Sequence, residues 1–138
     1  MREIKFRGLR TDGKGWVEGS LLQSEISTNG YCECAIVDRF SMLYDTARHE
    51  VIPESVGQFT GLHDKNGKDI YEGDGVKFSV RRNYSEVGLQ TIIFKSVVEW
   101  DEGCFMITES DKNDTYLYAH SAECEIIGNI HESEVSND

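Results

Sequence analysis

Residues 60–74 read TGLHDKNGKDIYEGD and carry the strongest turn signal of the chain. Asn66-Gly67 stands between two short β-type stretches, and this dipeptide favours a two-residue type I′ hairpin turn, whose central residues both need positive φ. The Gly73-Asp74 step is typical of a corner before a strand, where the aspartate caps backbone N–H groups. The stretch therefore predicts a hairpin and a sharp strand entry. The residues expected to define this backbone path are Gly61, Asn66, Gly67, Gly73 and Asp74.

Toward the C-terminus, short apolar runs alternate with turns. From residue 76, apolar and polar residues alternate over one strand length, as expected of a strand with one buried face. Residues 81–88 are polar and predict a loop, whereas residues 91–100 are the most apolar run and place Trp100 in the core. About five short strands after Gly73 favour a small antiparallel barrel of the SH3-like kind.

The chain is expected to fold as two β-rich parts, which suits its length of 138 residues. Residues 1–56 are predicted to form a smaller N-terminal module, residues 57–132 the SH3-like barrel, and residues 133–138 a frayed polar tail. No Pro/Ser-rich linker separates the two parts, so we expect them to pack on each other. The predicted fold class is therefore mainly β, with short antiparallel strands.

The negative charge is concentrated in the last third of the chain. Residues 96–138 contain eleven acidic residues and one basic residue, Lys112, whereas residues 1–95 are close to neutral. Duplex nucleic acids are bound mainly by lysine and arginine at the phosphates, so this charge argues against that class unless a local basic surface exists. The acidic region is either a solvated face or a phosphate mimic that occupies a DNA-binding protein.

The candidate basic surface consists of Lys77, Arg81, Arg82 and Lys95, with Tyr84 as an aromatic residue expected to be exposed. Small barrels bind single-stranded nucleic acid by combining a basic groove with aromatic stacking. The alternative is that these charges are solvated side chains of separate strands and loops, the usual state of surface lysine and arginine. The nucleic-acid hypothesis requires all four basic side chains to lie on one face.

The four cysteines, Cys32, Cys34, Cys104 and Cys124, are expected to be free thiols. Residues two apart on a strand share a face, so Cys32 and Cys34 could form a four-thiolate zinc site with the other two cysteines. The spacing lacks the two matched C-x2-4-C pairs of structural zinc sites, and unpaired cysteine behaves as a small buried hydrophobe. The N-terminus lacks an export signal, which argues against disulfides. We therefore expect no metal and no cofactor.

The sequence carries no catalytic signature. Its neighbouring carboxylates, such as Asp64 with Asp69 and Asp101 with Glu102, fall in predicted turns, whereas an acid–base pair needs one carboxylate shielded from water. Nucleophile-elbow, Walker and dinucleotide-binding motifs do not occur. No apolar run approaches the roughly 20 residues of a transmembrane helix. We therefore expect a non-enzymatic, cytoplasmic protein without catalytic residues or membrane attachment.

Six segments occur together in a familiar order: REIKFRG (2–8), WV (16–17), VIPESVGQFTGL (51–62), DKNGKDIYEGD (64–74), VVEWD (97–101) and EIIGNIHE (125–132). In this order they resemble the YopX family of phage and prophage proteins over nearly the whole chain, with variable loops at 23–50 and 81–90. The resemblance implies a β-rich protein with a barrel-like part. It implies no activity, because none is established for the family. Gly75 departs from the apolar residue that commonly follows the Gly-Asp pair, which suggests a bulge or a loosened strand start.

Two functions are consistent with these observations. The first is a phage or prophage accessory protein that binds a host or phage protein and forms homo-oligomers, because exposed strand edges need pairing or covering. The second is nucleic-acid binding through the basic residues and Tyr84, which the acidic net charge disfavours.

Residues 116–119 are a predicted strand on which Tyr116 and Tyr118 share a face, either inside the barrel or at an interface.

Overall fold

The computed structural model describes residues 3–23, 34–38, 48–101, 103–110 and 113–131. Antiparallel strands and short 3-10 helices make up its regular structure, so the prediction of a mainly β protein is confirmed. The chain divides into two compact units, unit 1 with residues 1–59 and unit 2 with residues 60–138. No helix in the described part of the chain is long and apolar enough to cross a membrane.

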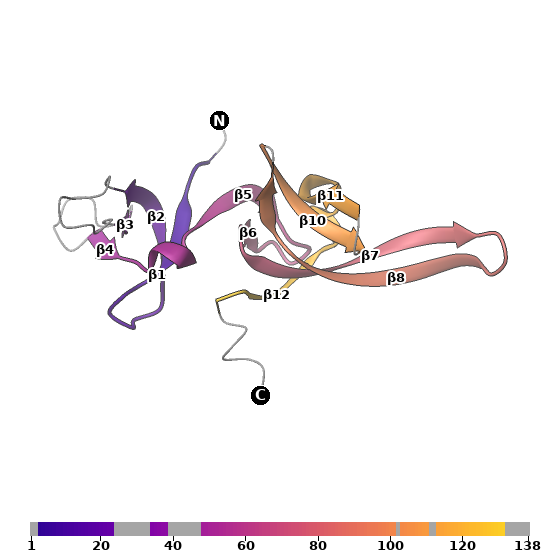
Figure 1. The fold of residues 1–138 in the computed structure, drawn as a ribbon, viewed down its shortest axis with the longest axis horizontal. Helices are drawn as coiled ribbons and strands as arrows, with labels where there is room; N and C mark the ends of the chain where they lie inside the picture. Colours follow the sequence, from indigo (N-terminus) through magenta and orange to yellow (C-terminus); the bar gives the residue numbers. More distant parts are fainter. Residues whose placement is uncertain (1–2, 24–33, 39–47, 102, 111–112, 132–138) are drawn as a thin grey trace. The chain divides into compact units, whose positions relative to one another are not determined.

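Unit 1 contains antiparallel strands that form a sheet (Figure 1). A small hydrophobic core of buried side chains also lies in this unit. In sheet order its strands are β4 (Arg48–Glu50), β3 (Cys34–Val37), β2 (Trp16–Gln23), β1 (Phe6–Leu9) and β5 (Gly57–His63). Only the first two residues of β5 pair with β1. In the turn of the β1–β2 hairpin, the Asp12 carboxylate accepts the Lys14 N–H at 3.0 Å. The buried side chains of this core are Val17, Cys34, Ile36 and Val51.

β5 runs from unit 1, where it pairs with β1, into unit 2, where it pairs with β6 (Asp69–Tyr71). The 3-10 helix η3 (Pro53–Ser55) precedes β5 and begins at a proline, which suits the start of a helix. The buried Ser55 hydroxyl donates to the Ile52 carbonyl at 2.6 Å and accepts the Leu9 N–H at 2.8 Å. These two bonds hold the chain against β1 just before β5 begins.

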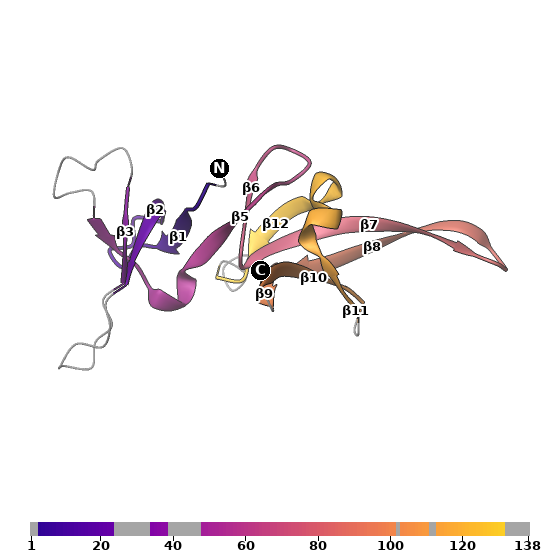
Figure 2. The same ribbon diagram turned by 90° about the horizontal axis from the view of Figure 1, so that it is seen from above.

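Unit 2 contains, among its described residues, two three-stranded antiparallel sheets (Figure 2). One has the order β12 (Glu125–Asn129), β7 (Asp74–Tyr84) and β8 (Gly88–Val97), and the other has the order β11 (Asn113–Tyr116), β10 (Cys104–Ser110) and β9 (Glu99–Asp101). Two 3-10 helices, η4 (Leu117–Ala119) and η5 (Ser121–Glu123), connect β11 to β12. The Thr108 N–H on β10 donates to the Ser96 hydroxyl on β8 at 2.8 Å and links the two sheets.

The core of unit 2 lies against one face of the inner halves of β7 and β8. Val76 and Phe78 are buried, whereas Lys77 and Ser79 at the alternate positions are half-buried, so β7 follows the alternation seen in the sequence. The rings of Phe78 and Phe94 stack across the two strands with centroids 5.6 Å apart. The buried cluster consists of Ile70, Val76, Phe78, Val98, Ile107, Leu117 and Cys124.

The strands of unit 2 depart from the predicted barrel. The described strands form separate open sheets and no closed barrel, so the SH3-like barrel is not confirmed. Residues 81–84 are strand rather than loop, because the β7–β8 ladder continues without a register shift as far as Tyr84 opposite Gly88. A bulge lies near Gly75 as expected, but the extra residue belongs to β12, whose register shifts between Ile126 and Gly128.

Two expectations about aromatic segments are also corrected. Trp100 is 48 % exposed, because it lies on the short outer strand β9. Its ring meets the Phe105 ring in a T-shaped contact, with 4.8 Å between the centroids. The predicted strand 116–119 ends at Tyr116 and continues as the 3-10 helix η4, which buries Leu117 in the core.

Candidate functional site

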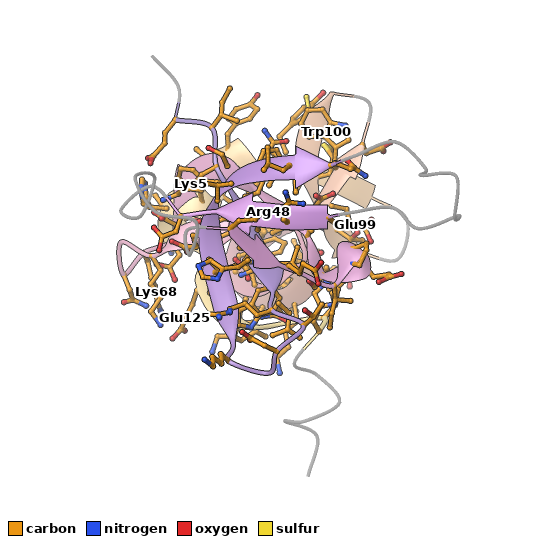
Figure 3. The ribbon with its side chains drawn as sticks, turned by 90° about the vertical axis from the view of Figure 1, so that its left-hand side faces the viewer. Lys5, Arg48, Lys68, Glu99, Trp100 and Glu125 are labelled. Atoms are coloured by element: carbon orange, nitrogen blue, oxygen red, sulfur yellow. The ribbon has the colours of Figure 1, made fainter. Side chains whose placement is uncertain are left out.

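Asp64 stands before the hairpin turn between β5 and β6, and both oxygens of its carboxylate are bonded. Oδ1 accepts the N–H groups of Asn66 and Lys68, each at 2.9 Å, and Oδ2 accepts the Ile126 N–H at 3.1 Å. The residue is 5 % exposed. Lys68 and Glu125, labelled in Figure 3, lie on the two segments that this carboxylate joins. Asp64 therefore ties the turn to β12.

The turn itself differs from the predicted type I′ turn. The Asp64 N–H donates to the Lys68 carbonyl at 2.8 Å, and the Gly67 N–H donates to the Asp64 carbonyl at 3.0 Å. The central residues are therefore Lys65 and Asn66, and Gly67 follows them in the left-handed region at φ 80°. This is the pattern of a three-residue hairpin loop with glycine in its last position. The Asp64 carboxylate favours the longer loop, because it bonds two N–H groups within it.

Asp64 and the nearby Cys124 are two groups at this turn whose surroundings shift their pKa. Burial disfavours the charged form of Asp64, but the N–H donors of Lys68, Ile126 and Asn66 outweigh burial and lower its pKa below the ordinary 3.8. Burial raises the pKa of the nearby Cys124 thiol to about 11, and its Sγ donates to the His120 carbonyl at 3.2 Å. A bonded carboxylate and a protonated thiol offer neither a general base nor a nucleophile.

Asp74 forms the second backbone anchor of unit 2. It is 2 % exposed, and its Oδ2 accepts the Tyr71 N–H at 2.8 Å, which is the capping geometry that the sequence predicts at this corner. Gly73 takes a φ of 92°, and its N–H donates to the Val98 carbonyl at 2.8 Å. Gly61, also at positive φ, lies within β5. These residues of the central stretch shape the backbone path and do not form a catalytic group.

The remaining candidate ligands and acids do not assemble into a site. Cys34 is buried in the core of unit 1, Cys104 is exposed on β10, and Cys32 lies outside the described residues. Asp69 pairs with the exposed His63 at 2.9 Å from its Nε2. Over the described ranges, no three His, Cys, Asp or Glu side chains gather as a metal site would require.

The β7–β8 hairpin extends past the core of unit 2 as an arm, which we define as residues 81–93 (Figures 1 and 2). Its ladder has regular register throughout, from Gly75 opposite Val97 to Tyr84 opposite Gly88. Three apolar side chains of the arm, those of Val87, Leu89 and Ile93, are each more than half exposed. The arm is therefore a regular β structure that buries little of its own apolar surface.

The register of the arm divides the predicted basic residues between two faces. Lys77 lies opposite Lys95, and Arg81 shares their face because it is an even number of residues from Lys77. Arg82 and Tyr84 occupy the alternate positions and share the opposite face. There the Arg82 guanidinium lies over the Phe94 ring, 5.9 Å from the centroid. The four basic side chains do not converge on one face, which weakens the nucleic-acid hypothesis.

A second exposed surface lies on the β9–β10–β11 sheet. The rings of Tyr116 and Tyr118 stack with centroids 5.4 Å apart, and about half or more of each side chain is exposed. Met106 lies opposite both Tyr116 and Glu99, so these three residues share one face of the sheet. Tyr116 therefore shares an exposed face of the sheet with Met106 and Glu99, and Tyr118 stacks on it from η4, so neither ring lies in a barrel interior.

The exposed apolar residues of the arm are the site residues that the sequence analysis missed. The sequence predicts a polar loop at residues 81–88, and residues 91–100 are its most apolar run, with Trp100 expected in the core. The available signal was the series Leu89, Thr91, Ile93 and Lys95, which occupies one face of a strand and mixes apolar with polar side chains. A strand face of that composition is typical of a solvent-exposed or partner-covered surface.

Residues 5–135 match the family model described as YopX protein. Among solved structures, the chain is similar to protein EF1440 from Enterococcus faecalis, with a TM-score of 0.50, 21 % sequence identity and 97 % of each chain covered. At that identity the likeness shows a shared fold and nothing about activity. No curated protein matches the chain.

Proposed function

The chain belongs to the YopX family, and we propose that it is a non-enzymatic phage or prophage accessory protein of the host cytoplasm, which binds a protein partner and self-associates. The observation that carries the proposal is the arm, a long regular hairpin with Val87, Leu89 and Ile93 more than half exposed. Exposed apolar side chains on an extended strand mark a surface that pairs with another chain.

The chemistry of the acidic residues supports a binding role over a catalytic one. The buried carboxylates of Asp64 and Asp74 are occupied by backbone N–H donors. The thiol of Cys124 has a raised pKa, and Cys34 lies within a hydrophobic core. The side chains best placed to meet another molecule are therefore the apolar, basic and aromatic ones on exposed strands.

The test compares an arm variant with a control variant in unit 1 that also replaces an exposed leucine by glutamate. Val87→Glu with Leu89→Glu places two charges on the arm, whereas Leu22→Glu places one on the exposed end of β2 in unit 1. We expect the wild type and Leu22→Glu to exceed the monomer mass in light scattering and to retain a specific protein from prophage-induced cells after nuclease treatment. The arm variant should have the mass of a monomer and should no longer retain the protein. A monomeric wild type that retains no protein, or an arm variant that behaves as the wild type does, contradicts the proposal.

Nucleic-acid binding is the second candidate function, because Lys77, Arg81 and Lys95 share one face of the hairpin. Between residues 77 and 95 the chain has four basic residues and one acidic residue, Glu86, so this segment is basic within an acidic protein. A basic strand face attracts a phosphate backbone with a steep dependence on salt.

Arg81→Glu and Arg82→Glu form a matched pair, since they make the same charge change on opposite faces of the arm. Binding to a labelled single-stranded oligonucleotide is measured by fluorescence anisotropy at two salt concentrations. The second candidate requires Arg81→Glu to weaken binding more than Arg82→Glu does, and the wild type to bind much more weakly at the higher salt. Absent or salt-insensitive binding, or equal effects of the two variants, excludes it.

A further inference from the structure

We propose that a second copy of this chain pairs with the outer edge of β8, antiparallel and around a two-fold axis at Thr91, so that two arms form one continuous sheet. The inference rests on the proposed function, and it names the surface that self-association uses. Three features of β8 support it: an open edge, a self-complementary order of side chains, and a favourable placement of charge.

The edge of β8 is open to pairing along the arm. Among the described residues, β7 is the only sheet neighbour of β8, and β8 is the outer strand of its sheet. Natural edge strands are blocked by bulges, prolines or charged side chains. β8 has none of these along its outer half, because its register with β7 is regular and its only charged residue, Lys95, lies toward the core. An unblocked edge of this kind is a template for another strand.

The side chains of β8 are self-complementary about Thr91. Leu89, Thr91 and Ile93 lie at alternate positions and therefore share a face. In an antiparallel pair centred on Thr91, Leu89 of each copy lies opposite Ile93 of the other. Both side chains are more than half exposed in the single chain, and direct cross-strand apolar pairs stabilise a sheet. The two-fold pairing thus brings four exposed apolar side chains into two cross-strand contacts on one face of the joined sheet.

The same register also suits the charges. It sets Lys95 opposite Val87 of the second copy, next to the turn that carries Glu86, the single acidic residue between Lys77 and Lys95. The two copies of Lys95 lie at opposite ends of the pairing, so they do not repel each other at close range. Because the pairing is two-fold and closes on itself, it gives a dimer and not a filament.

Cysteine cross-linking tests the register on the full chain. Each variant carries Cys104→Ser, which removes an exposed thiol. Directly opposed residues have Cα atoms roughly 4.5–5.5 Å apart, within the range that a disulfide spans. Under mild oxidation, Thr91→Cys should form a covalent dimer by itself. Leu89→Cys and Ile93→Cys should each remain uncross-linked alone and should cross-link to each other when mixed.

The outcomes separate this inference from the proposed function. The predicted cross-linking pattern supports the β8 pairing. A chain that exceeds the monomer mass in light scattering but does not cross-link at Thr91→Cys overturns the β8 pairing and leaves self-association in place. A chain that stays monomeric overturns both the β8 pairing and self-association. Cross-linking to the same extent at all three positions, without mixing, also overturns the register.

A charge at the two-fold axis gives an independent measurement. Thr91→Lys brings two ammonium groups together in the dimer, and we expect it to raise the dimer dissociation constant at least about tenfold, an effect that salt reduces. Thr91→Ser, which keeps the hydroxyl, serves as the control and should leave the dissociation constant nearly unchanged. A Thr91→Lys variant that dimerises as the wild type does contradicts the proposed axis.

Discussion

The two hairpins of unit 2 use their polar residues in opposite ways. In the β5–β6 hairpin, Asp64 is buried and its carboxylate binds backbone N–H groups from the turn and from β12. In the β7–β8 arm, Arg81 and Tyr84 face solvent together with apolar side chains. The segment that is richest in recognisable motif residues therefore specifies the backbone path. The segment that looks like a variable polar loop presents the surface available to a partner.

This difference predicts where stability resides. A hydrogen bond to a buried charged group contributes about 1.5–3 kcal/mol, whereas an exposed charge on a strand contributes well under about 1 kcal/mol. Substitutions at the anchors Asp64 and Asp74 should lower the free energy of unfolding much more than charge reversals in the arm do. Four measurements test this contrast, beginning with the largest expected effect.

Asp74→Ala should destabilise unit 2 the most. The change leaves the buried Tyr71 N–H without the carboxylate that accepts it at 2.8 Å, and we expect the free energy of unfolding to fall by about 3 kcal/mol. Asp69→Ala is the control, because Asp69 is partly exposed and pairs with an exposed histidine, His63. Urea unfolding followed by tryptophan fluorescence measures both. Equal losses in the two variants would show that burial at Asp74 is not the cause.

Asp64→Asn should cost about 2 kcal/mol at neutral pH, because an amide keeps one acceptor oxygen and turns a donor toward the Ile126 N–H. The folded state lowers the pKa of Asp64 below 3.8, so its ionised form stabilises the fold above that pH, and this contribution is lost as the pH falls through the lowered value. The stability difference between wild type and variant should therefore shrink in acid. A difference that stays constant between neutral pH and the acid limit contradicts the assignment.

The contrast between the hairpins also shows which features the sequence determines locally. The alternation from Val76 to Phe78 and the cap at Asp74 depend on residues close together in the chain, and both were predictable. The bond from Asp64 to the Ile126 N–H joins residues 62 positions apart, and no local pattern indicates it. It also changes the turn, because the carboxylate holds two N–H groups of a longer loop than the Asn66-Gly67 dipeptide favours.

The candidate site was harder to predict for the same reason. Residues 81–84 are polar. A strand is recognised in a sequence by the apolar residues of its buried face, so a polar segment of this kind is predicted as a loop. They are strand because residues 88–91 pair with them, a property of the partner strand and not of the segment itself. Trp100 was assigned to the core from its apolar neighbours, but β9 is a short outer strand that leaves half of the ring exposed.

Gly67→Val tests the turn at an intermediate magnitude. Gly67 takes a φ of 80°, and a Cβ added there has no atom within 4 Å, so the cost is backbone strain alone. We expect a β-branched residue to lower the free energy of unfolding by about 1–2 kcal/mol. Gly67→Asn should cost less, because asparagine tolerates the left-handed region. Thermal unfolding of the two variants gives the comparison, and an unchanged melting temperature for Gly67→Val would refute the left-handed assignment.

The smallest effects should come from the arm, where Arg81→Glu is expected to change the free energy of unfolding by less than about 0.5 kcal/mol. Arg82→Glu should cost about 0.5 kcal/mol more, because it removes a guanidinium that lies over the Phe94 ring. A loss above about 1.5 kcal/mol for Arg81→Glu in urea unfolding would mean that the arm is part of the folding core. If the losses are small, any binding defect of the arm variants reports the surface itself, because the fold that supports the arm is intact.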